Sequence, residues 1–174
     1  MRRPRQLDNA DELHAAAVRA LMRRAHSIHE MRRALERRCT DEALVRAELD
    51  RLKQQNLLDD ARYAREFARA HAAIRRQGRF RIAQELRRRG VPDRHIDAAL
   101  DEAFATQDET ALLRQRLERK LRGIRGPLDQ RRLASLYRSL LRAGFSPDQV
   151  RAAINSLARG ATLDPDAATP ETGE

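Results

Sequence analysis

The chain has 174 residues and a net charge of +10, because its 36 lysines and arginines outnumber its 26 aspartates and glutamates. This length and the 41% hydrophobic content suit one folded domain or a short array of small units rather than a disordered chain. The surplus of cations predicts attraction to polyanions or acidic protein surfaces, and no apolar run approaches the roughly 18 residues that span a bilayer.

Two features indicate where the protein works. The basic start, Met1–Gln6, is followed by charged and amphipathic sequence, so we expect no secretory signal. Cys39 is the single cysteine and can form no internal disulfide, which fits a reducing compartment. We therefore expect a cytoplasmic protein.

Glycine and proline divide the chain into helix-sized intervals, with glycine expected just past helix ends and proline in the first turn of the next helix. The dividing residues are Gly78, Gly90, Pro92, Gly123, Gly126, Pro127, Gly144 and Pro147. Between them, apolar residues recur every three or four positions, as Leu13, Ala17 and Leu21 do near the start. No segment alternates with a period of two, so we predict helices and no strands.

Polar residues mark several helix starts. Ser27 with Glu30, and Ser146 with Gln149, each fit a capping box. Asp59 and Asp60 could suggest paired catalytic or metal-binding carboxylates, but adjacent residues on a helix diverge and no third ligand lies nearby. We interpret them as capping and dipole-complementing residues at the start of the helix that carries Tyr63. Tyr63 and Phe67, one turn apart, are expected to anchor the core rather than to stack on bases.

The helices repeat in threes. Leu86–Val91 followed by Ile96–Leu100 aligns without a gap on Leu140–Phe145 followed by Val150–Ile154. A weaker copy, Leu35–Thr40 followed by Val45–Leu49, places Cys39 where the other copies carry glycine. A three-helix unit this small buries too little surface to be stable alone, so stacked modules are predicted.

The predicted fold is therefore all-α, an elongated and curved array of three tandem three-helix modules with about nine helices. We expect a basic arm over residues 1–8, modules over 9–55, 56–106 and 107–159, and a flexible acidic tail over 160–174.

One stretch resembles a known family. It carries Ser27 with Glu30, then the sequence Leu-Asp-Asp-x-Arg-aromatic-Ala over residues 58–64, then Gly-x-x-Arg-Ile-x-x-Glu-Leu-x-x-x-Gly over residues 78–90. These motifs, specific in combination, are similar to those of the RecX family, and the similarity fades toward residue 157. Departures from the family pattern are Met31 for leucine, Asn56 for glycine and Phe67 for tryptophan. The residues taken as the structural signature are Ser27, Glu30, Asp59, Asp60, Tyr63, Gly78, Gly90 and Gly144.

The resemblance implies a monomeric, non-enzymatic regulator of the recombinase RecA in DNA repair and the SOS response. Such a protein lies in the groove of the RecA–DNA filament, limits filament growth, and damps the ATPase, strand-exchange and co-protease activities.

The residues themselves offer little for catalysis or metal binding. The spacing of His26, His29 and Cys39 does not match zinc-ligand patterns, and no Cys-x-x-Cys occurs. Neither a Gly-rich phosphate loop nor a Gly-x-Ser-x-Gly turn is present. We therefore expect no catalytic residue, no metal and no cofactor.

Arginines carry the partner-binding hypothesis. The aligned copies place Arg37, Arg88 and Arg142 at one position, and Arg33, Gln84 and Arg138 one turn earlier. Arg75, Arg76, Arg79 and Arg81 add positive charge in the second copy. The predicted partner-binding residues are Arg33, Arg37, Arg75, Arg76, Arg79, Arg81, Arg88, Arg138 and Arg142, and we expect Arg33, Arg37, Arg81, Arg88, Arg138 and Arg142 to be exposed.

An equally simple interpretation of these arginines is a solvated face with weak ion pairs to neighbours such as Glu36 and Glu85. Two rival functions also stay open: an autonomous helical nucleic-acid-binding protein, and a scaffold for an unrelated acidic protein. The family motifs favour the RecA filament as partner, with weak contact to single- or double-stranded DNA and none to membranes.

Overall fold

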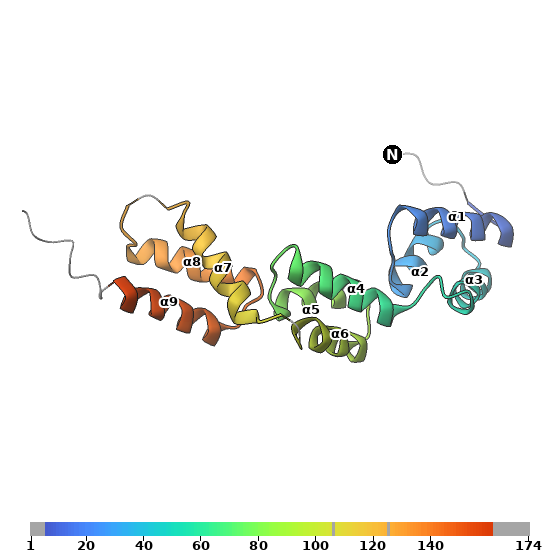
Figure 1. Cartoon of the computed structure of the whole chain (residues 1–174). Helices are drawn as coiled ribbons and strands as arrows, with labels where there is room; N and C mark the ends of the chain where they lie inside the picture. The colour runs from blue at the N-terminus through green and yellow to red at the C-terminus, as the bar shows by residue number, and fades with distance from the viewer. Residues whose placement is uncertain (1–5, 106, 125, 162–174) are drawn as a thin grey trace, which may run out of the picture.

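The computed structural model describes residues 6–105, 107–124 and 126–161, which form nine α-helices and no strand (Figure 1). The helices are α1 Ala10–Arg23, α2 Ile28–Glu36, α3 Glu42–Gln54, α4 Asp60–Ala73, α5 Arg79–Arg88, α6 Asp93–Ala105, α7 Glu109–Leu121, α8 Gln130–Arg142 and α9 Pro147–Ala161. The all-α prediction is confirmed. Most of the predicted arm and tail, residues 1–5 and 162–174, lies outside the described residues.

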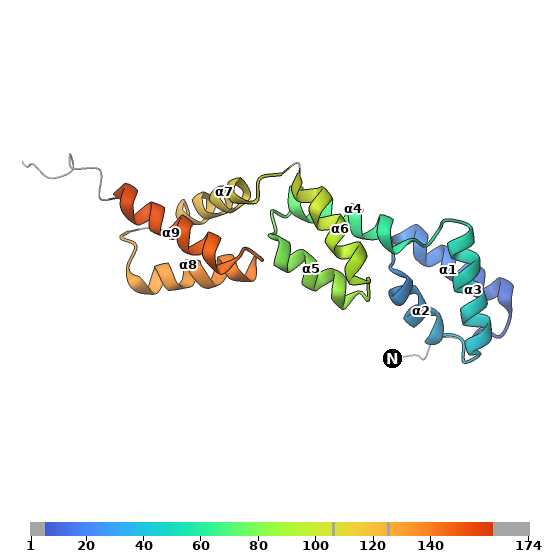
Figure 2. The same cartoon turned by 90° about the horizontal axis from the view of Figure 1, so that it is seen from below.

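The helices form three groups that follow one another along an elongated row: α1–α3 (module 1), α4–α6 (module 2) and α7–α9 (module 3) (Figures 1 and 2). Each module has its own buried apolar cluster. Leu35 belongs to the first, Leu86 to the second and Leu140 to the third. The predicted helical-repeat architecture is confirmed.

Side-chain caps explain where most helices begin. Asn9 accepts a hydrogen bond from the Asp11 amide, and Asp41, Asp59, Asp108 and Asp129 cap in the same way. The capping boxes predicted at Ser27 and Ser146 are both present. Short polar segments between the apolar stripes therefore fix the helix boundaries.

The residue just after the C-cap adopts a left-handed backbone conformation in three helices, α3, α5 and α8. Gly90 and Gly144 have φ of 72° and 95°, and Asn56 has φ of 55°. Asparagine tolerates this region better than most other non-glycine residues, which explains why Asn56 can occupy this position.

The middle helices of the modules, α8, α5 and α2, follow one another end to end along the row (Figure 2). Where α5 meets α2, the Ser27 hydroxyl donates to the carbonyl of Arg89 at 2.5 Å. Beside this contact, the Ile28 amide donates to Oδ1 of Asp60 at 2.9 Å. The first turn of α2 is thus bonded to the end of α5 and the start of α4.

The junction between α5 and α8 uses equivalent positions. The Gly78 amide donates to the carbonyl of Ala143 at 2.9 Å, and the Arg79 amide donates to Oε1 of Glu109 at 2.9 Å. In both junctions, therefore, the first turn of a middle helix binds one carbonyl at the end of the next middle helix. In both, it also binds one carboxylate in the first turn of the next module.

The structure corrects the role expected of one signature glycine, Gly78, whereas Gly90 and Gly144 lie just past the ends of α5 and α8 as predicted. Gly78 does not follow a helix; it is the N-cap of α5, and a Cβ there would lie 2.3 Å from the carbonyl oxygen of Gly144. A Cβ on Gly144 would lie 2.4 Å from Cβ of Arg81, and one on Gly90 would lie 2.4 Å from the ring of His29. These glycines are required because two modules approach closely there.

Two further expectations change. Asp60 is not a cap of its own helix: Asp59 alone accepts from the Ala61 and Arg62 amides, while Asp60 is buried and accepts from Ile28 in module 1. Leu7, which the sequence assigns to a basic arm, is buried in the core of module 1.

Candidate functional site

Each junction between modules carries a groove lined by arginines. The first groove, a cavity of about 340 Å³ where α2 meets α5, is lined by Arg24, His29, Glu30, Arg33, Arg37 and Arg88. The second groove, a cavity of about 390 Å³ where α5 meets α8, is lined by Phe80, Arg81, Gln84, Arg87, Leu141, Arg142 and Gly144.

The two grooves are built in the same way. An exposed aromatic ring lies at the second residue of the leading helix, His29 on α2 and Phe80 on α5. An exposed arginine ends the helix on the other side of each groove, Arg88 on α5 and Arg142 on α8. Each groove therefore takes its arginines and its ring from two different modules, and it exists only because the modules are joined end to end.

The first groove has the larger surplus of charge. Arg24 forms a bidentate contact with Glu30, at 3.0 and 3.1 Å. Arg33, Arg37 and Arg88 are exposed, and none of them forms an ion pair with another described residue. Three guanidinium groups from two modules therefore face solvent in one groove without a partner.

The second groove is weaker in charge. Arg81 contacts Glu85 with an Nε to Oε1 distance of 2.6 Å, and Arg87 contacts Asp93 at 2.7 Å. Among the described arginines that line this groove, only Arg142 has no acidic partner. The first groove therefore carries more unpaired positive charge than the second.

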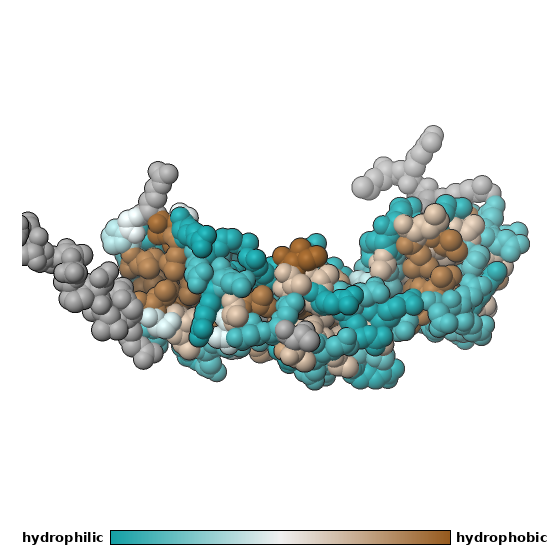
Figure 3. Space-filling view, viewed as in Figure 1, coloured by the Kyte–Doolittle hydropathy of each residue, from teal (hydrophilic) through white to brown (hydrophobic). Residues whose placement is uncertain are grey.

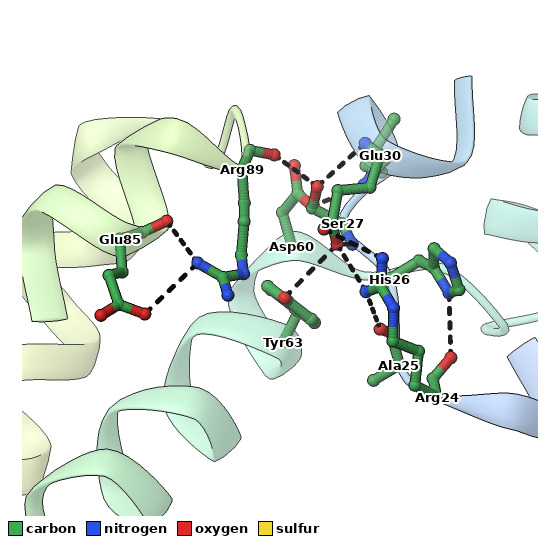
Figure 4. Close-up of polar contacts among 10 residues, drawn as sticks. Arg24, Ala25, His26, Ser27, Glu30, Asp60, Tyr63, Glu85 and Arg89 are labelled. Carbon is green, nitrogen blue, oxygen red and sulfur yellow. Dashed lines mark hydrogen bonds and ion pairs between the residues drawn. The ribbon is translucent and has the colours of Figure 1, made fainter. Parts of the chain in front are cut away.

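A polar network holds the wall of the first groove in place (Figure 4). Glu30 accepts from Arg24, from the Ser27 amide at 3.3 Å and from the Tyr63 hydroxyl at 3.4 Å. Burial alone would raise the pKa of Glu30, but the bonds from Arg24 and Ser27 and the charge of Arg24 lower it overall. Glu30 stays ionised and neutralises Arg24, so the remaining arginines supply the free charge.

At the same junction, the side chain of Arg89 contacts residues of its own module. Its Nη1 donates to the carbonyl of Glu85 at 2.8 Å, and its guanidinium lies 4.6 Å from the ring centroid of Phe67. Tyr63 is buried and its ring centroid lies 6.0 Å from that of Phe67, as expected for core anchors. Arg89 therefore supports the junction and does not line either groove.

The arginines predicted to bind a partner differ in their exposure and in whether they line a groove. Arg33, Arg37, Arg88, Arg138 and Arg142 are exposed as expected, but Arg81 is half-buried against Glu85. Arg138 lies one turn before Arg142 on α8 and lines neither groove.

Three other predicted arginines line neither groove. Arg79 contacts Asp101 at 2.9 Å and lies over the ring of Phe104, so it ties α5 to α6. The carbonyls of Arg75 and Arg76 accept from Arg116 at 3.2 Å, where α4 ends beside α7. These residues connect elements of the fold rather than extend the groove.

Sequence reasoning missed Arg24, His29 and Asp60 as parts of the junction. His29 and Phe80 occupy equivalent positions in the aligned copies, and this could have indicated a shared surface. Asp60 gave no such signal, because its bond to Ile28 joins different modules.

In the part of the chain that the structure describes, no group of three or more histidine, cysteine, aspartate or glutamate side chains could hold a metal ion. No described helix is long and apolar enough to cross a membrane. The face shown in Figure 3 is mostly hydrophilic, with apolar side chains gathered in a few patches.

Comparisons with known proteins agree with this architecture. The family model for the second three-helix domain of RecX matches residues 59–100, and the model for the third matches residues 107–154. A crystal structure of a regulatory protein RecX superimposes with a TM-score of 0.69 at 23% identity, over 84% of this chain and 71% of the other. RecX from Lactobacillus salivarius gives 0.68 at 18% identity, over 87% and 98%. These structures show the fold.

Curated relatives are more similar in sequence. A regulatory protein RecX of Halorhodospira halophila is 43% identical over 138 residues, which are 79% of this chain and 83% of the relative. One of Pseudomonas putida is 35% identical over 158 residues, 91% of this chain and 96% of the relative. With matches of this extent in both chains, the protein belongs to the RecX family.

Proposed function

We propose that the chain is a non-enzymatic regulator that works in the cytoplasm, binds the RecA–DNA filament through the two junction grooves, and inhibits or modulates the recombinase, ATPase and co-protease activities of RecA. The observation that carries the proposal is the set of unpaired guanidinium groups of Arg33, Arg37 and Arg88 in one groove. Family membership supports a regulatory role, and the groove supports an acidic partner.

The chemistry of the groove suits carboxylates on a protein surface. A guanidinium binds a carboxylate through two parallel hydrogen bonds, and Arg37 and Arg88 converge from two helices. Because α5 connects the first groove to the second, one chain can engage two acidic sites at a fixed spacing. Two linked contacts bind a filament of repeating subunits more tightly than they bind a single subunit.

Autonomous nucleic-acid binding is the second candidate. The same arginines suit phosphates, and the exposed rings of His29 and Phe80 could stack on bases. However, aromatic residues make up only 3% of the chain, so stacking contributes little and binding to naked DNA should be weak and salt-sensitive.

The deciding experiment is DNA-dependent ATP hydrolysis by the cognate RecA with increasing amounts of this protein. Inhibition at far less than one regulator per RecA indicates blocking of filament growth. Inhibition only at amounts that saturate the DNA indicates competition for DNA, and would overturn the proposed mechanism.

The groove is tested by the double variant Arg37→Ala with Arg88→Ala. Its matched control is Arg114→Ala with Arg119→Ala, which removes the same charge from exposed positions on α7. We expect the first variant to lose inhibition and the control to keep it. Equal losses in both would show that net charge matters and the groove does not.

A further inference from the structure

No described module lies before module 1, yet α2 ends in the same kind of acceptor that α5 and α8 present. In the aligned copies, Arg38 is equivalent to Arg89 and Ala143. The carbonyls of Arg89 and Ala143 accept from Ser27 and Gly78 in the preceding module. The free end of α2 is therefore built like a surface on which another module could dock.

The chain covers this surface with its own N-terminal segment. The Leu7 amide donates to the carbonyl of Arg38 at 2.7 Å, so the equivalent acceptor is occupied in all three modules. The Leu7 side chain is 4% exposed and packs in the same cluster as Cys39. Asn9, two residues later, caps α1 and fixes the segment to the module.

Cys39 supports the same interpretation. Gly90 and Gly144, its counterparts, have positive φ and leave no room for a Cβ, because a preceding module packs on them. Cys39 does not have a positive φ, and its side chain is buried in its own module. Among the three described modules, the glycine is thus absent in the copy on which no other described module docks.

At the opposite end of the row, no bond from the start of α8 to another module is found among the described residues. α8 begins with Gln130 and Arg131, and the Asp129 cap reaches only the Arg132 amide. In α5 the equivalent first-turn amides bind the next module. A helix N-terminus carries partial positive charge and a helix C-terminus carries partial negative charge. The start of α8 is therefore complementary to the end of α2 when the N-terminal segment does not cover that end.

We propose that residues 6–9 are an end cap, which occupies the docking surface of module 1 and prevents the α8 end of another copy of this chain from stacking there. Such stacking would be head-to-tail and would not close, so without the cap it would continue from copy to copy. The segment therefore ends the array at module 1.

The test compares the full chain with a variant that lacks residues 2–8 and with the milder Leu7→Ala. In sedimentation velocity at increasing concentration, we expect the parent to remain monomeric and both variants to form larger species, the deletion more strongly. The labelling rate of the Cys39 thiol should rise by about tenfold or more as the cap is lost, because burial limits access to a thiol. Circular dichroism checks that the helices persist.

Two controls separate the proposal from general destabilisation. Met22→Ala removes a large apolar side chain that is 81% exposed, and it should change neither association nor labelling. Adding Gln130→Pro to the deletion removes an amide donor at a position where proline is tolerated, and it should restore the monomer. Folded deletion and Leu7→Ala variants that stay monomeric, or association that Gln130→Pro does not reverse, would overturn the proposal.

Discussion

The hydroxyl of Ser27 donates to the carbonyl of Arg89 at 2.5 Å, although the two residues belong to different modules. The same hydroxyl accepts from the Glu30 amide at 3.1 Å, so one buried side chain both starts α2 and ties it to α5. At the next junction, Gly78 supplies its backbone amide to the equivalent carbonyl of Ala143. The two junctions therefore share an acceptor carbonyl at the end of a middle helix, which accepts from a serine hydroxyl in one junction and from a glycine amide in the other.

Ser27→Ala should cost about 2 to 3 kcal/mol of unfolding free energy, because the Glu30 amide loses its cap and the Arg89 carbonyl is left unsatisfied. Ser146→Ala is the matched control, since Ser146 caps the Gln149 amide and no bond from its hydroxyl to another module is found among the described residues. Its cost should be about 1 kcal/mol. Urea unfolding of both variants measures the difference, and equal losses would contradict the double role of Ser27.

Gly144→Ala should destabilise the junction between modules 2 and 3. Its φ of 95° disfavours any side chain, and the new Cβ would lie 2.4 Å from the Arg81 backbone nitrogen. We expect a loss of about 2 kcal/mol or more, with faster amide exchange at the start of α5. Gly123→Ala is the control, because its nearest neighbour, the Lys120 carbonyl, lies at 3.5 Å. If both variants melt alike, close approach is not the reason for Gly144.

The sequence predicts the helices and their threefold repeat, because apolar spacing and capping residues are local properties. It even places Arg37, Arg88 and Arg142 at equivalent positions. It does not predict that Arg37 of one module meets Arg88 of the next in one groove. That meeting depends on helices packing by their ends, and hydrophobic periodicity describes only the faces that helices bury. For the same reason, the sequence predicts that Gly78 ends a helix and that Asp60 caps one, whereas both lie at contacts between modules.

Asp60→Asn should stabilise the protein increasingly as the pH rises. Burial raises the pKa of Asp60, while the Ile28 amide and the charge of His95 oppose that rise. Because the pKa of Asp60 is raised in the folded protein, its contribution to the free energy of unfolding is complete at pH values below the ordinary pKa of an aspartate. That contribution is lost as the pH rises through the raised pKa. Asparagine keeps an acceptor for Ile28 without the buried charge.

The free energy of unfolding of parent and Asp60→Asn, measured from acid to neutral pH, checks this prediction. The gap in favour of asparagine should widen across the titration of Asp60 and then become constant. Asp60→Ala, which leaves the Ile28 amide without its acceptor, should be less stable than Asp60→Asn at every pH. A gap that does not vary with pH would show that the carboxylate is as well stabilised when folded as when unfolded.

Arg88→Ala combined with Arg142→Ala should leave stability nearly unchanged and weaken inhibition of RecA. Both side chains are exposed and neither forms an ion pair with a described residue, so the folded chain loses little. Each groove, however, loses the arginine contributed by the following module. A charge-assisted contact at an interface is worth about 1 to 3 kcal/mol, so the half-inhibitory concentration should rise by about tenfold or more.

Arg79→Ala provides the contrasting case for these two arginines. Arg79 contacts Asp101 and lies over the Phe104 ring, so its removal should lower the melting temperature slightly and leave inhibition unchanged. Thermal melts and the ATPase assay on the same preparations separate the two effects. An Arg88 and Arg142 double variant that folds normally and inhibits as well as the parent would falsify the assignment of the grooves, while family membership, which rests on sequence and fold, would stand.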